Sequence, residues 1–172
     1  GFTASHDTSE AGMNRQQIDR VIDRLSTIGR VLISSEQELP PSLRELRIPS
    51  PVERFHHVLA AAELVVGDSQ SVCSEAGVVG TPSLRFNTWA GRHPYQVELE
   101  ERWGLTKAFH LDDEPKFYAE LDRLLDDLPA AHARHAAVIP FDLRPADIRA
   151  RGPSAAAARL EAAHLARLDR HD

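Results

Sequence analysis

Apolar positions along the first 128 residues follow two alternating patterns. Longer segments carry apolar residues at helical spacing, and short runs of three or four apolar residues lie between them. The predicted helices span residues 14–28, 51–62, 94–103 and 117–128, with a short helix around Cys73, and the predicted strands span 31–33, 64–66, 83–86 and, at an edge, 108–110. Short buried strands that alternate with helices are typical of a parallel sheet covered on both faces. The fold class is therefore expected to be α/β, a Rossmann-like three-layer sandwich.

Sequence signals define the ends of these helices. Asn14 is the predicted N-cap of the first helix and Gly29 its end, and residues 50–53 form a capping box for the second. Gly104 ends the third helix, and Pro40-Pro41 marks a loop. The apolar faces of the first and last helices are expected to consist of Ile18, Val21, Ile22, Leu25 and Ile28, and of Phe117, Leu121, Leu124, Leu125 and Leu128.

The turn Gly67-Asp68-Ser69-Gln70-Ser71 joins a predicted strand to the short helix that follows it. The start of a helix presents backbone N–H groups without partners and the positive end of the helix dipole, which together attract anions. Glu75 lies about one turn into this helix, where its carboxylate can reach a ligand bound at the helix start. Phosphates on the amides and ribose hydroxyls on the carboxylate suit a nucleotide. The alternative is an ordinary strand-to-helix turn followed by a surface glutamate.

Three further candidate residues lie in or beside loops at the same edge of the predicted sheet, where open parallel sheets bind their ligands. His6 either contacts a ligand or belongs to a capped loop without one. Arg85 can pair with a phosphate or with a surface carboxylate. Asn87 follows a predicted strand and is either a ligand-edge residue or a turn residue. The complete candidate ligand-binding set is His6, Asp68, Ser69, Gln70, Ser71, Glu75, Arg85 and Asn87.

Composition excludes several classes of protein. A net charge of −6 over 172 residues argues against a general nucleic-acid binder, which needs a basic face. Cys73 is the single cysteine, so the chain can form no internal disulfide and no zinc site built from several thiolates. His132 and His135 have helical spacing but no third ligand beside them, so no metal site is predicted. No apolar run approaches the roughly 20 residues of a transmembrane helix, and a cytoplasmic location is expected.

The two ends of the chain differ from its middle. The chain begins with Gly1, and residues 2–4 look like the last residues of a strand, which favours a fragment of a longer protein, although a processed or trimmed N-terminus gives the same pattern. Residues 1–128 are expected to form the Rossmann-like domain, and residues 129–172 a helical tail rich in Ala and Arg, with one Ala-rich helix over 154–170. Three roles for this tail remain open: packing on the domain, contact with a second copy in a homo-oligomer, or fraying.

The segment 67–82 resembles a known family. Its motifs GDSQSVCSEA (67–76) and GTP (80–82) are similar to a segment of UDP-N-acetylglucosamine 2-epimerases, in which two glycines stand where this chain has Gln70-Ser71. The longer run 2–110 resembles a group of GT-B-like proteins known as domain of unknown function 354. The motifs that carry this second resemblance are SHD (5–7), ISSE (33–36), GDSQ (67–70), GTP (80–82), RFN (85–87), GR (91–92), and Tyr95 with Leu99-Glu100 followed by Gly104-Leu105.

The resemblance implies a GT-B fold, which has two Rossmann-like domains with the active site in the cleft between them. This chain would be the C-terminal half, and the missing N-terminal domain would be its partner. The resemblance further implies that Ser69, Gln70 and Ser71 hold a diphosphate largely through backbone amides and that Glu75 accepts hydrogen bonds from ribose hydroxyls. It places His6 near the phosphates or the sugar, and the loop 47–49 near the base. The expected ligand is a nucleotide-sugar, in first place a UDP-sugar, with no other cofactor and no metal.

From this resemblance, the expected function is that of the nucleotide-sugar-binding half of a glycosyltransferase or of a sugar-nucleotide epimerase, in cell-envelope polysaccharide synthesis. No residue of this chain is assigned a catalytic role, because the catalytic acids of the epimerases lie largely in the other half. The chain alone is therefore expected to be inactive. The alternative is a non-catalytic binding or assembly module with a Rossmann-like fold.

Overall fold

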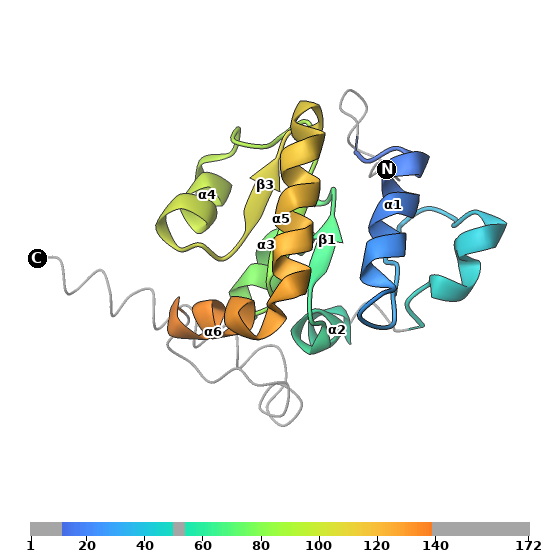
Figure 1. Ribbon diagram of the computed structural model, residues 1–172, viewed down its shortest axis with the longest axis horizontal. Helices are drawn as coiled ribbons and strands as arrows, with labels where there is room; N and C mark the ends of the chain where they lie inside the picture. The colour runs from blue at the N-terminus through green and yellow to red at the C-terminus, as the bar shows by residue number, and fades with distance from the viewer. Residues whose placement is uncertain (1–11, 50–53, 139–172) are drawn as a thin grey trace, which may run out of the picture.

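The computed structural model of the chain describes residues 12–49 and 54–138. Its centre is a parallel sheet of three strands in the order β1-β2-β3 (Figure 1). The strands are β1 (Val65–Gly67), β2 (Ser83–Phe86) and β3 (Lys107–Phe109). Gly67 pairs with Arg85, and Phe86 pairs with Phe109. The predicted strands 64–66, 83–86 and 108–110 are therefore confirmed, two of them displaced by one residue.

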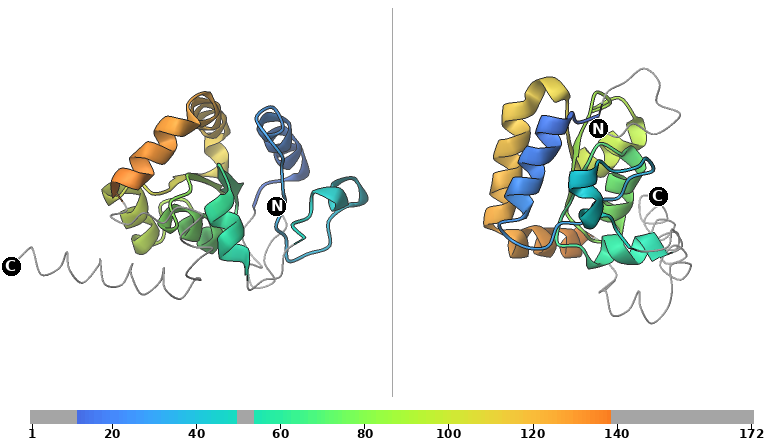
Figure 2. Two further views of the ribbon diagram at one scale, coloured as in Figure 1. Left: turned by 90° about the horizontal axis from the view of Figure 1, so that it is seen from below. Right: turned by 90° about the vertical axis from the view of Figure 1, so that its right-hand side faces the viewer.

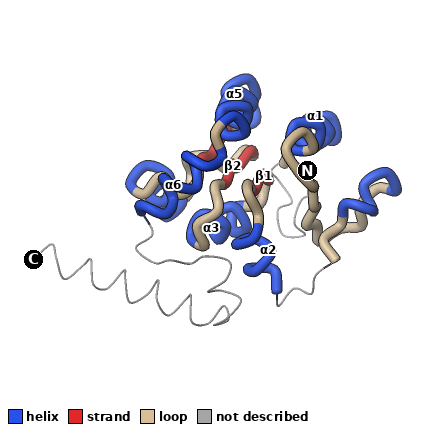
Figure 3. The backbone as a smooth tube through the Cα atoms, turned by 60° about the horizontal axis from the view of Figure 1, so that its bottom comes forward, coloured by secondary structure: helices blue, strands red, loops and turns tan. Residues whose placement is uncertain are grey.

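Helices cover both faces of this sheet, as the α/β prediction requires. Figures 2 and 3 show α1 and α5 on one side of the strands and α2 and α3 on the other. Helix α3 crosses from β1 to β2, and α4 with a π-helical turn at Glu98–Arg102 connects β2 to β3. The helices are α1 (Arg15–Leu25), α2 (Phe55–Ala61), α3 (Gln70–Val78), α4 (Pro94–Val97), α5 (Glu114–Asp126) and α6 (Leu128–Val138), with 3₁₀ turns at Pro41–Leu46 and Leu111–Asp113.

The main core lies between the sheet and helices α1 and α5. Phe117 of α5 is completely buried and stacks on Phe86 of β2, with ring centroids 4.2 Å apart and planes 4° from parallel. Phe109 and Tyr118 contact the same Phe117 ring edge-on, at 6.0 Å and 5.1 Å. The buried members of this cluster are Met13, Val21, Leu84, Phe86, Phe117, Tyr118, Leu121, Leu124 and Ala131.

The other face of β2 is covered by α3. The Ser83 hydroxyl donates to the backbone oxygen of Cys73 at 2.8 Å, and the Cys73 sulfur lies 3.6 Å from the backbone oxygen of Leu84. All four residues of β2 are buried, which is expected of a central strand with helices on both faces. The buried strand therefore holds the loop that follows it in a fixed position.

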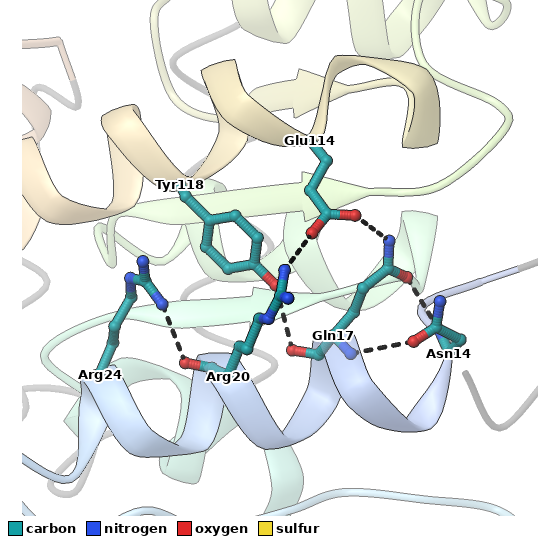
Figure 4. A network of polar contacts seen from close by, with 6 residues as sticks. All are labelled: Asn14, Gln17, Arg20, Arg24, Glu114 and Tyr118. Atoms are coloured by element: carbon teal, nitrogen blue, oxygen red, sulfur yellow. Dashed lines mark hydrogen bonds and ion pairs between the residues drawn. The ribbon is translucent and has the colours of Figure 1, made fainter.

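A polar network fastens α1 to α5 at the edge of this core (Figure 4). Glu114 accepts from Gln17 at 2.7 Å and from Arg20 at 2.8 Å. The Arg24 guanidinium lies 4.4 Å from the centre of the Tyr118 ring, whose hydroxyl donates to the backbone oxygen of Gln17 at 3.4 Å. Burial raises the pKa of the Tyr118 hydroxyl, which stays protonated and able to donate at neutral pH.

Helix α1 begins as predicted and ends earlier. Asn14 is its N-cap and forms a reciprocal capping box with Gln17. The helix ends at Leu25, where the backbone N–H groups of Thr27 and Ile28 donate to the oxygens three residues before them, and the hydroxyl of Thr27 also donates to the backbone oxygen of Arg24 at 2.7 Å. Ile28 consequently lies outside the helix and is 46% exposed, so its predicted place on the apolar face is wrong.

The predicted buried strand 31–33 is also wrong. Ile33 forms one isolated bridge to Arg47, and Leu32 is 39% exposed. The backbone of Ile33 donates to the oxygen of Leu46 at 2.7 Å and accepts from Ile48 at 3.0 Å. These bonds tie the segment to the chain just after the 3₁₀ helix, which itself replaces the loop predicted at Pro40-Pro41. The capping box predicted at 50–53 lies outside the described residues.

The beginning of the predicted tail packs on the domain. Helix α6 starts at Leu128, its Ala131 belongs to the core, and its His135 ring lies 2.9 Å from the backbone oxygen of Leu105. Residues 139–172, with the helix predicted at 154–170, lie outside the described residues. Within the described ranges, no helix is long and apolar enough to cross a membrane.

Candidate functional site

The loops that follow β1 and β2 meet at the carboxyl edge of the sheet. The side-chain amide of Asn87, just after β2, donates to the backbone oxygen of Asp68, just after β1, at 2.7 Å. The backbone N–H of Asn87 donates to the oxygen of Phe109 in β3 at 3.1 Å. Asn87 therefore links the ends of all three strands, at the edge where open parallel sheets bind ligands.

At the start of α3, two backbone donors have no hydrogen-bond partner among the described residues. Ser69 is the N-cap in an extended conformation, and its hydroxyl accepts from the N–H of Val72 at 3.4 Å. Within the described residues, the N–H groups of Gln70 and Ser71 make no hydrogen bond, as the first N–H groups of a helix cannot do so inside the helix. These two donors and the helix dipole form a local positive site of the kind that binds phosphate.

The Asp68 carboxylate modifies this site. It lies in close contact with Gly12, and a side chain at position 12 would collide with it unless the Asp68 side chain moved. The negative charge of this carboxylate, close to the helix start, weakens the attraction of the helix start for an anionic ligand. The same carboxylate is a good acceptor for hydroxyl groups.

Glu75 points from α3 toward α2. Its carboxylate lies 3.2 Å from the His56 ring nitrogen, a contact that is an ion pair only when the imidazole is protonated. Both side chains are about half exposed. A ligand hydroxyl can therefore replace His56 as the partner of Glu75 without opening the core.

Arg85 is enclosed rather than available at the surface. Its side chain is 1% exposed and donates to the side-chain oxygen of Gln96, while its Nε has no partner among the described residues. Burial lowers the pKa of the guanidinium, and the nearby charge of Glu100 opposes this change. The Glu100 carboxylate is held by the N–H of Ala108 at 3.1 Å. In this conformation Arg85 supports α4 through its hydrogen bond to Gln96 and does not reach a phosphate at the surface.

Cys73 lies inside the second face of the sheet and is completely buried. Burial raises the pKa of its thiol to about 12. The thiol is therefore protonated at neutral pH and has none of the thiolate character that a nucleophile needs. Cys73 packs α3 against β2, and its buried, protonated thiol is not suited to act as a nucleophile.

An aromatic cluster that extends from the loop after β2 into α4 is not predicted from the sequence. Trp89 and His93 stack with centroids 4.9 Å apart, and Tyr95 follows at 6.4 Å from His93. The Arg92 guanidinium lies 5.7 Å from the Trp89 ring centre. The signal in the sequence was three flat rings within seven residues directly after a predicted strand.

The structure brings most of the predicted residues together. Those at the edge of the sheet are Asp68, Ser69, Gln70, Ser71 and Asn87. Glu75 lies one turn further along α3, Arg85 lies beneath the surface, and His6 lies outside the described residues. Arg47, in the loop 47–49 that is predicted near the base, donates to the backbone oxygens of Ser35 and Gln37.

No family model, no curated protein and no solved structure matches this chain. The resemblance to GT-B-like proteins therefore stays a prediction. Among the described residues there is also no group of three or more His, Cys, Asp or Glu side chains placed to hold a metal ion. The functional conclusion rests on the fold and on the geometry at the carboxyl edge of the sheet.

Proposed function

We propose that this chain is the nucleotide-sugar-binding half of a GT-B-like glycosyltransferase or sugar-nucleotide epimerase. The observation that carries the proposal is the pair of free N–H groups of Gln70 and Ser71 at the start of α3, beside Asn87 at the carboxyl edge of the sheet. This is where a parallel α/β domain receives a phosphorylated ligand. The parallel sheet of three strands is then part of the C-terminal Rossmann-like domain of a GT-B fold.

In this proposal the diphosphate accepts hydrogen bonds from the N–H groups of Gln70 and Ser71, and the ribose hydroxyls donate to Glu75 in place of His56. A UDP-sugar is the ligand of first choice. The helix start stabilises the negative charge that gathers on the diphosphate when the bond to the sugar breaks, and this lowers the barrier to transfer or elimination. The catalytic groups belong to a second domain, in a cytoplasmic enzyme of envelope polysaccharide synthesis, so the chain alone turns over no substrate.

Two observations favour a second candidate, a non-catalytic binding or assembly module. The Asp68 carboxylate lies at the turn that would receive the diphosphate, and side chains occupy positions 70 and 71, where the epimerases have glycines. Both features reduce the affinity for an anion. The two candidates make different predictions for Glu75, because only a nucleotide-binding domain uses its carboxylate for a ligand.

Replacement of Glu75 by alanine tests the proposal. Calorimetric titration of the chain with UDP and with UDP-N-acetylglucosamine is expected to show saturable binding. In Glu75→Ala it is expected to become about 10- to 100-fold weaker, since a hydrogen bond to a charged group contributes about 1.5–3 kcal/mol. Removal of a negative charge near an anion would by itself strengthen binding, so a loss identifies a direct contact with the ribose.

Glu101→Ala is the matched control, because it removes one exposed carboxylate from the π-helical turn and leaves α3 unchanged. It is expected to leave the affinity for UDP within about 2-fold, as distant surface charges are screened. Equal or tighter binding of UDP by Glu75→Ala, or no binding of UDP by the unmodified chain, contradicts the proposal and favours the assembly module.

A further inference from the structure

The exposed end of the aromatic cluster after β2 is held in a fixed orientation. Tyr95 is 53% exposed, although it is one of the largest apolar side chains in the described part of the molecule. Its hydroxyl oxygen accepts from the side-chain nitrogen of Gln96 at 2.8 Å, and Gln96 in turn accepts from the enclosed Arg85. A chain of buried polar groups thus anchors a ring that lies in the solvent.

The other end of the cluster is fixed as firmly. The backbone N–H of Trp89 donates to the side-chain oxygen of Asn87 at 2.9 Å, and the N–H of Arg92 donates to the Trp89 oxygen at 3.1 Å. Asn87 also binds the backbone of Asp68. The aromatic cluster is therefore continuous with the start of α3, where the diphosphate is proposed to bind.

We propose that the exposed ring of Tyr95, at the end of the stack formed by Trp89 and His93, binds the apolar face of a pyranose ring, and we call these three rings the platform. Sugar C–H groups are slightly positive and pack on the negative faces of aromatic rings, and rings fixed in advance cost little entropy on binding. The Tyr95 hydroxyl suits a hydroxyl of the sugar, because it accepts from Gln96 and still has its own proton to donate.

The saccharide can be the sugar of the nucleotide-sugar or a separate acceptor sugar, and both offer the same pyranose face. The first source rests on the proposed function, because it requires the diphosphate at the start of α3. The second does not, since a free glycoside needs the platform alone. The three probes are UDP, UDP-N-acetylglucosamine and the methyl glycoside of N-acetylglucosamine.

The fluorescence of Trp89 can be used to measure ligand binding at the platform. The chain has two tryptophans, so Trp103→Phe leaves Trp89 as the single indole, and its fluorescence can be followed as each probe is added. In this background we expect both sugar-bearing probes, or one of them, to change the emission. Tyr95→Ala is expected to weaken sugar binding about 3- to 10-fold, the contribution typical of one aromatic partner, and to leave the affinity for UDP within about 2-fold.

Two further variants separate the ring from the fold. Tyr95→Phe keeps the ring and removes the hydroxyl that Gln96 binds, so it is expected to retain most of the sugar affinity. Ile28→Ala removes an exposed apolar side chain from the chain after α1, outside the platform, and is expected to leave all three affinities unchanged. Circular dichroism of each variant shows whether the domain is folded.

The outcomes distinguish the platform from the proposed function. A response to the free glycoside identifies an acceptor-type site, and a response to UDP-N-acetylglucosamine alone identifies the sugar of the nucleotide. Equal weakening of UDP and UDP-N-acetylglucosamine by Tyr95→Ala overturns the platform, because the ring then contacts the nucleotide and not the sugar. No effect of Tyr95→Ala on either sugar probe overturns it as well. Failure of UDP to bind contradicts the proposed function, while the glycoside still decides on the platform.

Discussion

Phe117→Ala is expected to lower the free energy of unfolding by about 3–5 kcal/mol, the usual cost of removing a buried phenylalanine. Phe117 has no exposed surface and contacts three other rings, those of Phe86, Phe109 and Tyr118. These contacts join α5 to the central strand and to the edge strand. Since small domains have only about 5–15 kcal/mol of stability in total, the variant is expected to lie near the limit of folding.

Urea denaturation followed by circular dichroism measures this loss, and Cys73 gives a second readout. Its thiol is buried and has a pKa of about 12, so a thiol reagent labels it only when the domain opens. Labelling is expected to be much faster in Phe117→Ala. Lys116→Ala, at the neighbouring exposed position of α5, is the control, with an expected change within about 0.5 kcal/mol. A loss below about 1 kcal/mol for Phe117→Ala would contradict the central role of this ring.

Gln70→Pro is expected to weaken UDP binding about 10- to 100-fold while leaving the domain folded. Proline at the first position of α3 removes one of the two free N–H groups, and a hydrogen bond from such a donor to a charged phosphate contributes about 1.5–3 kcal/mol. Proline is well tolerated at this position of a helix, where the N–H has no partner inside the helix. Ser69 before it has φ −74° and ψ 125°, an extended conformation that is compatible with a following proline.

Gln70→Ala is the matched control, because it removes the same side chain and keeps the N–H. If the backbone donor binds the phosphate, the alanine variant binds UDP as the unmodified chain does, and only the proline variant loses affinity. If the Gln70 side chain were the contact, both variants would lose affinity equally. Calorimetric titration of UDP into the three proteins, with thermal unfolding to check the fold, distinguishes these results.

Local sequence patterns predicted the helices and the strands of the sheet well. The capping box of Asn14 and the apolar spacing in α1 and α5 act within a few residues, so they can be read from the sequence. The segment 31–33 has the composition of a strand, but a strand also needs a partner. Its backbone bonds go to Leu46 and Ile48, a choice that depends on how the 3₁₀ helix folds back.

The candidate site was predictable only in part, for a similar reason. The turn after β1 and the N-cap Ser69 follow from local chemistry. The enclosure of Arg85 in β2 depends on Gln96, eleven residues away in α4, and the contact of Glu75 with His56 depends on how α2 packs on α3. Such contacts between distant segments cannot be read from spacing. The platform could not be predicted either, because the spacing of Trp89, His93 and Tyr95 along the chain does not show that their rings stack.

The most direct test of the central claim is the chemical shift of two backbone amides. In a titration of the ¹⁵N-labelled chain with UDP, the amide protons of Gln70 and Ser71 are expected to shift the most and to move downfield, because each forms a hydrogen bond to a phosphate oxygen. Both shifts should saturate with the dissociation constant that calorimetry gives. Unchanged amide shifts of Gln70 and Ser71 at saturating UDP would contradict the proposal that the start of α3 binds the nucleotide.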